Sequence, residues 1–336
     1  MHERVTAIGG GTGTPLVNES LIQAGVNYID AVVAVTDSGG ATGRMRTDSR
    51  GQEIAYSDAM RTLLSLVDPK FKNSPQYEAL EELLKSRMWN KVLGHSIFSH
   101  FYDETDGFEK VQKELEKLTN IEFKGRVMPS TTASANIVFK TQFGRTYQGE
   151  HQLDDYRMSK DMVVEMELVP QVNSYGPARE AIINADYIIY SCGSLYGSVL
   201  VNFLPQGMQE ALQQSKAKKY LVTNLASTRN ESHEFTPQDF VAIFRKYTGL
   251  QHPIDMMIIP EMTRREFESH YPEITKRYDA EHSHFLGWED TEIKKAQDEE
   301  GIEILIHQAT IIVPETNTLR HDPNALSKVF AKAILP

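Results

Sequence analysis

A glycine-rich segment near the N-terminus has the composition of a phosphate-binding loop. Residues 5–8 are apolar and predict a β-strand, which is followed by Gly9, Gly10, Gly11, Thr12 and Gly13. Glycine permits a close approach of the backbone to a ligand, and a helix starting near Pro15 would direct free N–H groups at an anion. The spacing is neither a complete dinucleotide fingerprint nor a P-loop. The segment predicts anion binding; the alternative is a tight turn without a ligand.

A second polar segment follows the apolar run of residues 29–35. The candidate ligand-binding residues in it are Asp37, Ser38, Gly39, Gly40, Gly43 and Arg44. In open α/β sheets, ligands bind beyond the carboxyl ends of the strands, where an acid can hold a ribose hydroxyl or a metal ion. The forked donors of an arginine suit phosphate. The alternative interpretation is an Asx-turn with solvated arginines.

A third strand end has the same character. The apolar run of residues 187–191 leads into Gly193, Ser194, Leu195 and Tyr196. The Ser194 hydroxyl can donate to a phosphate or sugar oxygen, or it can cap a helix. Cys192 stands alone in the chain, so we interpret it as a packing residue and not as a nucleophile.

Histidines and isolated acids give weaker signals. His95 precedes an apolar helical pattern and faces either a cleft or a helix start. Asp58 opens another helical pattern, where local rules favour an N-cap. His282 and His284 have metal-like spacing but no third ligand in the local sequence, so a surface loop is expected there.

The elements that must position these residues alternate in type. Short apolar runs alternate with amphipathic helical patterns over most of the chain, which predicts a mostly parallel sheet flanked by helices. Residues 121–170 break this pattern and predict a small antiparallel β insertion, with a hairpin turn at residues 143–145. Residues 261–300 are highly charged and predict a helical excursion or a lid. We expect one α/β domain over residues 1–336.

Composition narrows the partners. The 336 residues carry a net charge of -11, which disfavours a nucleic-acid partner. A single cysteine excludes an internal disulfide framework and suits the reducing cytoplasm. No segment is long and apolar enough to predict a membrane span or a signal peptide.

Taken together, the loops resemble the gluconeogenesis factor family, which shares a superfamily with 2-phospho-L-lactate transferase. The resemblance covers nearly the whole chain. It rests on the glycine segments at residues 9–13, 37–46 and 193–196, on Gly94-His95-Ser96 and on Arg320-His321-Asp322-Pro323. The resemblance implies a Rossmann-like core and a nucleotide-type ligand. It also adds Asn224 to the candidate ligand-binding residues.

The resemblance leaves two functions open. One is a regulator that binds a nucleotide-sugar such as UDP-N-acetylglucosamine and acts in carbon metabolism, cell shape and cell-wall precursor supply. It would bind a regulated enzyme partner and form a homodimer. The other is a transferase of the phospholactyl or phosphoryl type, in which Asp37 and Asp58 hold Mg²⁺. Ser38 stands where the gluconeogenesis factors usually carry a second acid, which weakens the metal site and favours the regulator.

Overall fold

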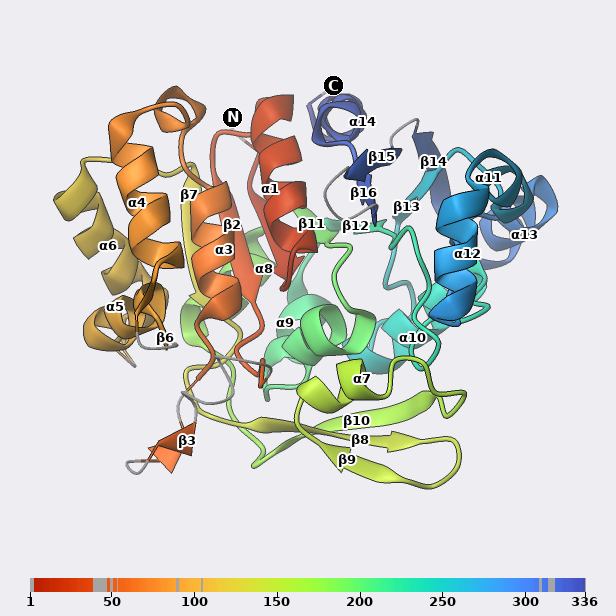
Figure 1. Ribbon diagram of the computed structural model, residues 1–336, viewed down its shortest axis with the longest axis horizontal. Helices are drawn as coiled ribbons and strands as arrows, with labels where there is room; N and C mark the ends of the chain where they lie inside the picture. Colours follow the sequence, from red (N-terminus) through yellow and green to blue (C-terminus); the bar gives the residue numbers. More distant parts are fainter. Residues whose placement is uncertain are drawn as a thin grey trace.

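A seven-stranded parallel sheet forms the centre of the protein (Figure 1). The computed structural model describes residues 3–38, 47–48, 51–52, 54–88, 91–103, 105–307, 310–313 and 318–335. Across the sheet the strands are β14 (Glu303–His307), β13 (Met256–Pro260), β12 (Lys218–Val222), β11 (Tyr187–Tyr190), β1 (Val5–Gly9), β2 (Ile29–Val33) and β7 (Gly125–Pro129). All neighbouring strands pair in parallel. The predicted mostly parallel α/β fold is confirmed.

The strand order reverses at the centre of this sheet. From β1 the chain proceeds outward through β2 to β7, and from β11 it proceeds in the opposite direction through β12 and β13 to β14. Strands β1 and β11 are adjacent, with Ala7 opposite Ile189. The connections leaving these two strands therefore diverge, which opens a crevice beyond their carboxyl ends.

Both faces of the sheet are buried, which explains why its strands are apolar almost throughout. Successive residues of a strand point to opposite faces. Ile8 and Ile188 accordingly belong to one hydrophobic core, and Ala7 and Ile189 belong to the other. One core lies on each face of the sheet, and each is covered by a layer of helices.

The first layer lies on the face of Ala7 and Ile189. Its helices are α1 (Gly13–Ala24), α3 (Ser57–Ser65), α4 (Pro75–Lys85), α5 (Leu93–Phe101), α6 (Gly107–Thr119) and α14 (Pro323–Ile334). Helix α14 packs against α1, so the two ends of the chain lie side by side (Figure 1).

The second layer covers the face of Ile8 and Ile188. Its helices are α8 (Gly176–Asn184), α9 (Met208–Gln214), α10 (Pro237–Thr248) and α13 (Asp290–Glu300). A π segment at Leu195–Val199 and a 3-10 segment at Leu200–Phe203 join this layer after β11. A separate 3-10 turn at Pro69–Phe71 packs against the first layer. None of the helices in the described parts of the chain is long and apolar enough to cross a membrane.

A small antiparallel sheet packs beside this second layer (Figure 1). It consists of β10 (Val163–Val169), β8 (Asn136–Thr141) and β9 (Thr146–Gln148), with α7 (His151–Asp155) directly after β9. The expected hairpin turn near Gly144 joins β8 to β9. The insertion begins later than expected, because residues 125–129 form β7 and pair with β2 in the main sheet.

The charged segment after β13 forms helices. These are α11 (Arg264–His270) and α12 (Pro272–Ala280), which pack around Phe267 and Phe285, followed by α13. Three two-stranded ribbons complete the described chain: β3 (Thr47–Asp48) with β4 (Gly51–Gln52), β5 (Arg87–Met88) with β6 (Lys91–Val92), and β15 (Thr310–Val313) with β16 (Thr318–His321).

Candidate functional site

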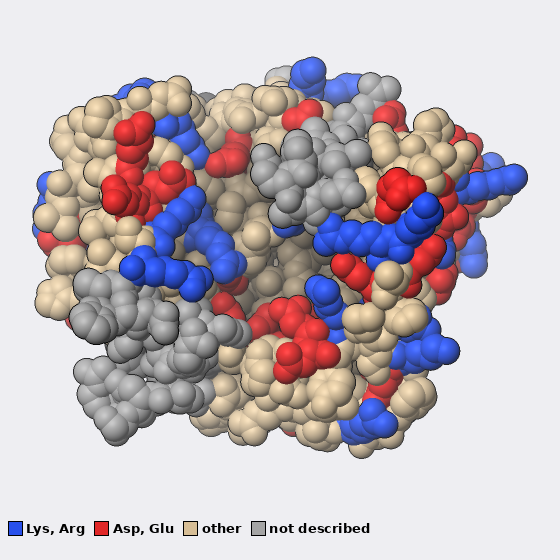
Figure 2. Space-filling model, in the orientation of Figure 1, with Lys and Arg blue, Asp and Glu red and all other residues tan. Residues whose placement is uncertain are grey.

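A cavity of about 910 Å³ lies at the crevice where the strand order reverses. Its walls come from the loops after β1, β2, β11 and β12, from helices α3, α5 and α7, and from the end of β16. Figure 2 shows a hollow near the middle of one face of the molecule, with Lys and Arg on either side and Asp and Glu below it. The cavity thus combines both signs of charge.

The glycines after β1 have two different roles. Gly11 lines the cavity together with Thr12, and its φ of +61° lies in the left-handed region that favours glycine. Gly9 and Gly13 are packed against the neighbouring loop; a Cβ on Gly13 would lie 2.5 Å from the carbonyl carbon of Cys192. Gly10 leaves room for Asp58, whose Oδ2 would lie 2.4 Å from a Cβ at that position.

The loop after β11 presents its backbone to the same cavity. Gly193 and Ser194 line it, and the side-chain amide of Asn224 donates to the Gly193 carbonyl at 2.8 Å. Leu195 and Tyr196, also proposed from the sequence, are buried in the core instead. The Tyr196 hydroxyl donates to the Val163 carbonyl at 3.1 Å. Ser194 also accepts from the Gly197 N–H, so the helix cap and the cavity position coexist.

The end of β2 contributes one acid to the cavity. Asp37 lines it and accepts a hydrogen bond from the Ser57 hydroxyl at 2.5 Å. The Ser38 hydroxyl is 2.8 Å from Nδ1 of His151, at the start of α7, and Ser38 is not among the lining residues. The other predicted residues of this loop lie outside the described chain; they are Gly39, Gly40, Gly43 and Arg44.

Asp58 and His95 both line the cavity from helices. Asp58 lies in the first turn of α3 and does not cap it. Burial raises the pKa of Asp58 to about 6, although Arg61, 3.2 Å away, and the Gly11 N–H both favour the carboxylate. His95 is also buried, and burial lowers its pKa despite the nearby charge of Asp37. Burial thus disfavours the charged forms of both side chains, the carboxylate of Asp58 and the imidazolium of His95.

Three further acids lie in or beside the cavity, and none of the three was predicted from the sequence. Glu150, just before α7, and Asp154, within α7, line the cavity. Glu231 lies beside the cavity residue Ser194 and accepts hydrogen bonds from the Ser194 hydroxyl and the Leu195 N–H. Burial, followed by the charges of Asp37 and its acidic neighbours, raises the pKa of Glu150 to about 8. Burial likewise raises the pKa of Glu231 to about 7. Like charges this close favour protons, a cation or a hydroxyl-rich ligand.

No local signal marks these three acids. The sequence predicts that the strand of residue 146 extends to Glu150, whereas β9 ends at Gln148 and Glu150 precedes a short helix. Glu231 reaches the cavity through a contact with Ser194, 37 residues earlier in the chain. Contacts of that separation follow from the fold and not from spacing.

Four basic side chains line the same cavity, and one of them, Arg61, is paired with Asp58. They are Arg61, Lys85, Arg87 and Arg320. Arg320 comes from β16 and its guanidinium donates to the Thr12 hydroxyl at 3.2 Å, beside the glycine turn. A guanidinium next to a glycine turn is a favourable setting for a phosphate.

Cys192 lies in the cavity wall between these loops. Burial raises the pKa of its thiol to about 11, so the thiol is protonated at neutral pH. This agrees with the interpretation of Cys192 as a packing residue.

The expectation of a surface loop at residues 282–284 is wrong for His284. Its side chain is buried, and Ser227, His233 and Glu234 surround it. Two of these neighbours precede it by about fifty residues in the sequence, which is why the local pattern lacked a third ligand.

Comparison with known proteins gives a consistent result. The family model described as 2-phospho-L-lactate transferase CofD matches residues 5–308. An Aquifex aeolicus protein, provisionally named a gluconeogenesis factor, is 30% identical over 98% of this chain and 96% of its own length. The Bacillus subtilis protein named gluconeogenesis factor is 26% identical over 97% and 96%. The crystal structure of a Bacillus halodurans protein superposes with a TM-score of 0.81 over both complete chains, at 24% identity, and supports the fold alone.

Proposed function

Because the chain belongs to the family described as 2-phospho-L-lactate transferase CofD, we propose that its cavity binds a nucleotide or nucleotide-sugar. The ligand class is that of UDP-N-acetylglucosamine. The protein then acts as a regulator of carbon metabolism and cell-wall precursor supply, through a regulated enzyme partner. The observation that carries the proposal is the meeting of three glycine-rich or polar strand ends with four basic side chains around one cavity.

The diphosphate fits the boundary between the glycine turn and the basic side chains. Gly11 has no Cβ, so a phosphate can approach the backbone, and Thr12 and Arg320 stand beside it. Arg61 and Arg87 supply further positive charge to the cavity. Several basic side chains together can neutralise the two adjacent phosphates of a diphosphate. The cavity therefore favours a diphosphate over a neutral ligand.

The sugar or ribose fits the acidic side. Carboxylates accept hydrogen bonds from hydroxyl groups, and a sugar offers several of them. Asp37, Glu150 and Asp154 all line the cavity and influence one another's charge. A ligand with anionic and hydroxyl-rich ends matches a cavity whose walls carry opposite charges.

A second candidate is a magnesium-dependent transferase, which the crowding of acids favours. The mutual repulsion of Asp37, Asp58 and Glu150 is one source of the raised pKa of Glu150, and a divalent cation would relieve it. Carboxylate oxygens are the ligands that Mg²⁺ prefers. Asp37 and Asp58 would hold the ion beside the proposed diphosphate, where it would neutralise charge on a leaving group.

Calorimetric titration with UDP-N-acetylglucosamine, UDP and GDP tests the proposal, with Mg²⁺ and again with EDTA. For the regulator we expect binding that persists in EDTA and no turnover of the nucleotide-sugar. Asp37→Asn should weaken binding about 10- to 100-fold, as expected for loss of a hydrogen bond to a charged group.

The variant Asp58→Asn separates the two candidates. If ligand binding by the wild type strictly requires Mg²⁺, if Asp58→Asn removes this dependence, and if the nucleotide-sugar is turned over, the protein is a transferase and not a regulator. Glu165→Gln is the matched control, because Glu165 lies on β10 with more than half of its side chain exposed. If none of the three nucleotides binds to the wild-type protein, both candidate functions are wrong.

A further inference from the structure

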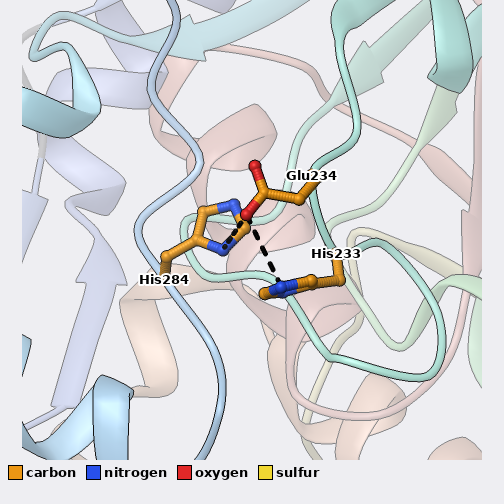
Figure 3. Close-up of side chains that lie close together, drawn as sticks. All are labelled: His233, Glu234 and His284. Atoms are coloured by element: carbon orange, nitrogen blue, oxygen red, sulfur yellow. Dashed lines mark ion pairs between the residues drawn. The ribbon is translucent and has the colours of Figure 1, made fainter. Parts of the chain in front are cut away.

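Two histidines and a glutamate from distant parts of the chain meet outside the main cavity (Figure 3). His233 and Glu234 lie in the loop between β12 and α10, and His284 lies between α12 and α13. One potential ligand atom from each lies within 4.8 Å of the other two. The two segments are joined beside this cluster, because the Ser227 N–H donates to the His284 carbonyl at 2.8 Å.

The spacing of the three side chains is close to that of a metal site. Oε1 of Glu234 is 3.5 Å from Nε2 of His233 and 3.9 Å from Nδ1 of His284. Ligand bonds of about 2.0–2.2 Å in a tetrahedral site place neighbouring ligand atoms roughly 3.4 Å apart. Small side-chain movements therefore suffice to close the cluster around one ion.

Two further features of the cluster are the second ring nitrogen of His233, which is not the atom nearest Glu234, and the backbone angle of Glu234. Nδ1 of His233 is buried and receives no hydrogen bond from the part of the chain that the structure describes. Glu234 has a φ of 58°, in the left-handed region that favours glycine. This backbone conformation directs the carboxylate toward the two imidazole rings, as Figure 3 shows.

The remaining neighbours suit the surroundings of an ion. Arg264 contacts both oxygens of Glu234 at 3.2 Å and also donates to Glu268 at 2.9 Å. An ion on Oε1 would leave Oε2 for Arg264, which would then orient the carboxylate. The Ser227 hydroxyl lies 3.1 Å from Nδ1 of His284 and accepts from the His284 backbone N–H at 3.0 Å, which holds this segment in place. An ion on Nδ1 would replace the contact of that nitrogen with Ser227.

We propose that His233, Glu234 and His284 form a binding site for a divalent transition-metal ion of the zinc class. Two imidazoles and one carboxylate are a common protein ligand set for Zn²⁺, whereas Mg²⁺ and Ca²⁺ prefer oxygen alone. Three protein ligands leave a position open. Glu234 and His284 border a separate cavity of about 260 Å³, which can supply a water molecule for that position.

The ion would cross-link the loop that forms one side of the main cavity. Asn224, Thr228 and Glu231 belong to the same connection as His233 and Glu234. Holding this connection to the segment of His284 would restrict the movement of these three residues. None of the three ligands lines the main cavity, so each can be substituted without changing a residue of the proposed nucleotide site.

Equilibrium dialysis of metal-free full-length protein against Zn²⁺, with metal analysis, tests the proposal. We expect one Zn²⁺ per chain that is lost in His233→Ala and in His284→Ala, and at least tenfold weaker binding in Glu234→Gln. His252→Ala is the control, because His252 is exposed and distant from the cluster in sequence. Zn²⁺ should also raise the thermal midpoint of the wild type but not of the histidine variants.

Substitution with Co²⁺ separates this cluster from the acids of the main cavity. A nitrogen-ligated low-coordinate Co²⁺ ion gives strong visible absorption, whereas an ion held by carboxylates and water absorbs weakly. We expect the strong band in wild type and in Glu150→Gln, and its loss in His233→Ala. Equal Zn²⁺ binding by all variants, or no binding by the wild type, would overturn the proposal. His233 is less buried than His284, so its variant keeps the test valid if His284→Ala does not fold.

Discussion

Two parts of the main cavity are held in place by different forces. One part, the glycine wall, consists of Gly9 at the end of β1, of Gly10, Gly11, Thr12 and Gly13 after it, and of Cys192, Gly193 and Ser194 after β11. The other part, the acid wall, consists of Asp37, Asp58, Glu150, Asp154 and Glu231. It adjoins the glycine wall, because Asp58 accepts from the Gly11 N–H and Glu231 accepts from the Ser194 hydroxyl. The first is stabilised by close packing of neutral backbone, and the second contains like charges that repel one another.

Close packing leaves the glycine wall little freedom. The Thr14 hydroxyl lies 2.8 Å from that of Ser191, and the side-chain amide of Asn202 donates to the Gly9 carbonyl at 3.2 Å. Each loop therefore fixes the other. A wall built in this way can meet a ligand without reorganising, and its residues contribute to folding as well as to binding.

The acid wall has the opposite balance. Glu150, Asp58 and Glu231 all have raised pKa values, so the folded state resists their ionisation. Buried like charges destabilise the native state and are retained where a ligand or ion compensates for them. The comparison implies that substitutions in the glycine wall reduce stability, whereas neutralising the acid wall increases stability and impairs binding.

The largest expected effect is at Gly13. A Cβ at this position would lie 2.5 Å from the backbone of Cys192, so Gly13→Ala forces the two loops apart. We expect the free energy of unfolding to fall by about 3 kcal/mol, as for severe overpacking. Urea denaturation measures this change. Gly176→Ala is the control; its Cβ would meet nothing within 4 Å, and we expect a change below about 0.5 kcal/mol. Equal effects of the two substitutions would contradict the packing role.

Next in size is the effect of pH on stability through Glu150. Its pKa rises from 4.5 in the unfolded chain to about 8 in the native state. Between these values the unfolded state releases the proton and the folded state retains it, so the free energy of unfolding should fall as pH rises from about 5 to about 8. Glu150→Gln should reduce this slope and be more stable than wild type at pH 8.

Thermal unfolding across that pH range measures the effect. Asp58 and Glu231 have pKa values raised in the same direction, so part of the slope should remain in the variant. Glu165→Gln, at an exposed position paired with Lys140 at 3.1 Å, should leave the slope unchanged. A variant of Glu150 that is less stable at pH 8 would show that the acid wall is not strained.

Most of the fold could be predicted from the sequence because parallel strands carry a local signal. Apolar runs that end in glycine or polar residues mark β1, β2 and β11, and their carboxyl ends lie at one edge of a parallel sheet. Residues 125–129 were harder to assign, because a strand next to an antiparallel insertion has no local mark of its partner. Their pairing with β2 is set by the fold.

The residues of the site also fall into those that local sequence predicts and those that depend on the fold. Gly11, Asp37, Asp58, His95, Gly193 and Asn224 are at strand ends or helix starts, and the structure brings them to one cavity. Leu195 and Tyr196 were proposed with their motif, but the π segment turns their side chains into the core. Glu231 and His284 depend on contacts between residues far apart in sequence, which spacing does not encode.

A smaller effect, confined to binding, is expected at the rim. Arg320 is exposed and contacts the Thr12 hydroxyl, so Arg320→Ala removes a cation from the proposed phosphate position without disturbing the core. We expect UDP-N-acetylglucosamine to bind about 10- to 100-fold more weakly, with an unchanged unfolding midpoint. Calorimetric titration provides the measurement, and Lys332→Ala on the exposed side of α14 is the control. Unaltered affinity would place the phosphate elsewhere.

The smallest effect concerns Cys192, which tests whether the glycine wall is chemically inert. Its thiol pKa of about 11 leaves about a hundredfold less thiolate at pH 8 than an ordinary cysteine with a pKa of 9 has. Alkylation by iodoacetamide should be correspondingly slow, and its rate should increase about tenfold per pH unit up to pH 10. Cys192→Ser should change ligand affinity less than twofold, because the Cys192 carbonyl and the backbone that contacts Gly13 remain. Mass spectrometry follows the reaction, with the urea-unfolded chain as the reference for an unshifted thiol. Alkylation of the native protein as fast as that reference would mean that the glycine wall carries a reactive group, and the contrast between a neutral and a charged wall would fail.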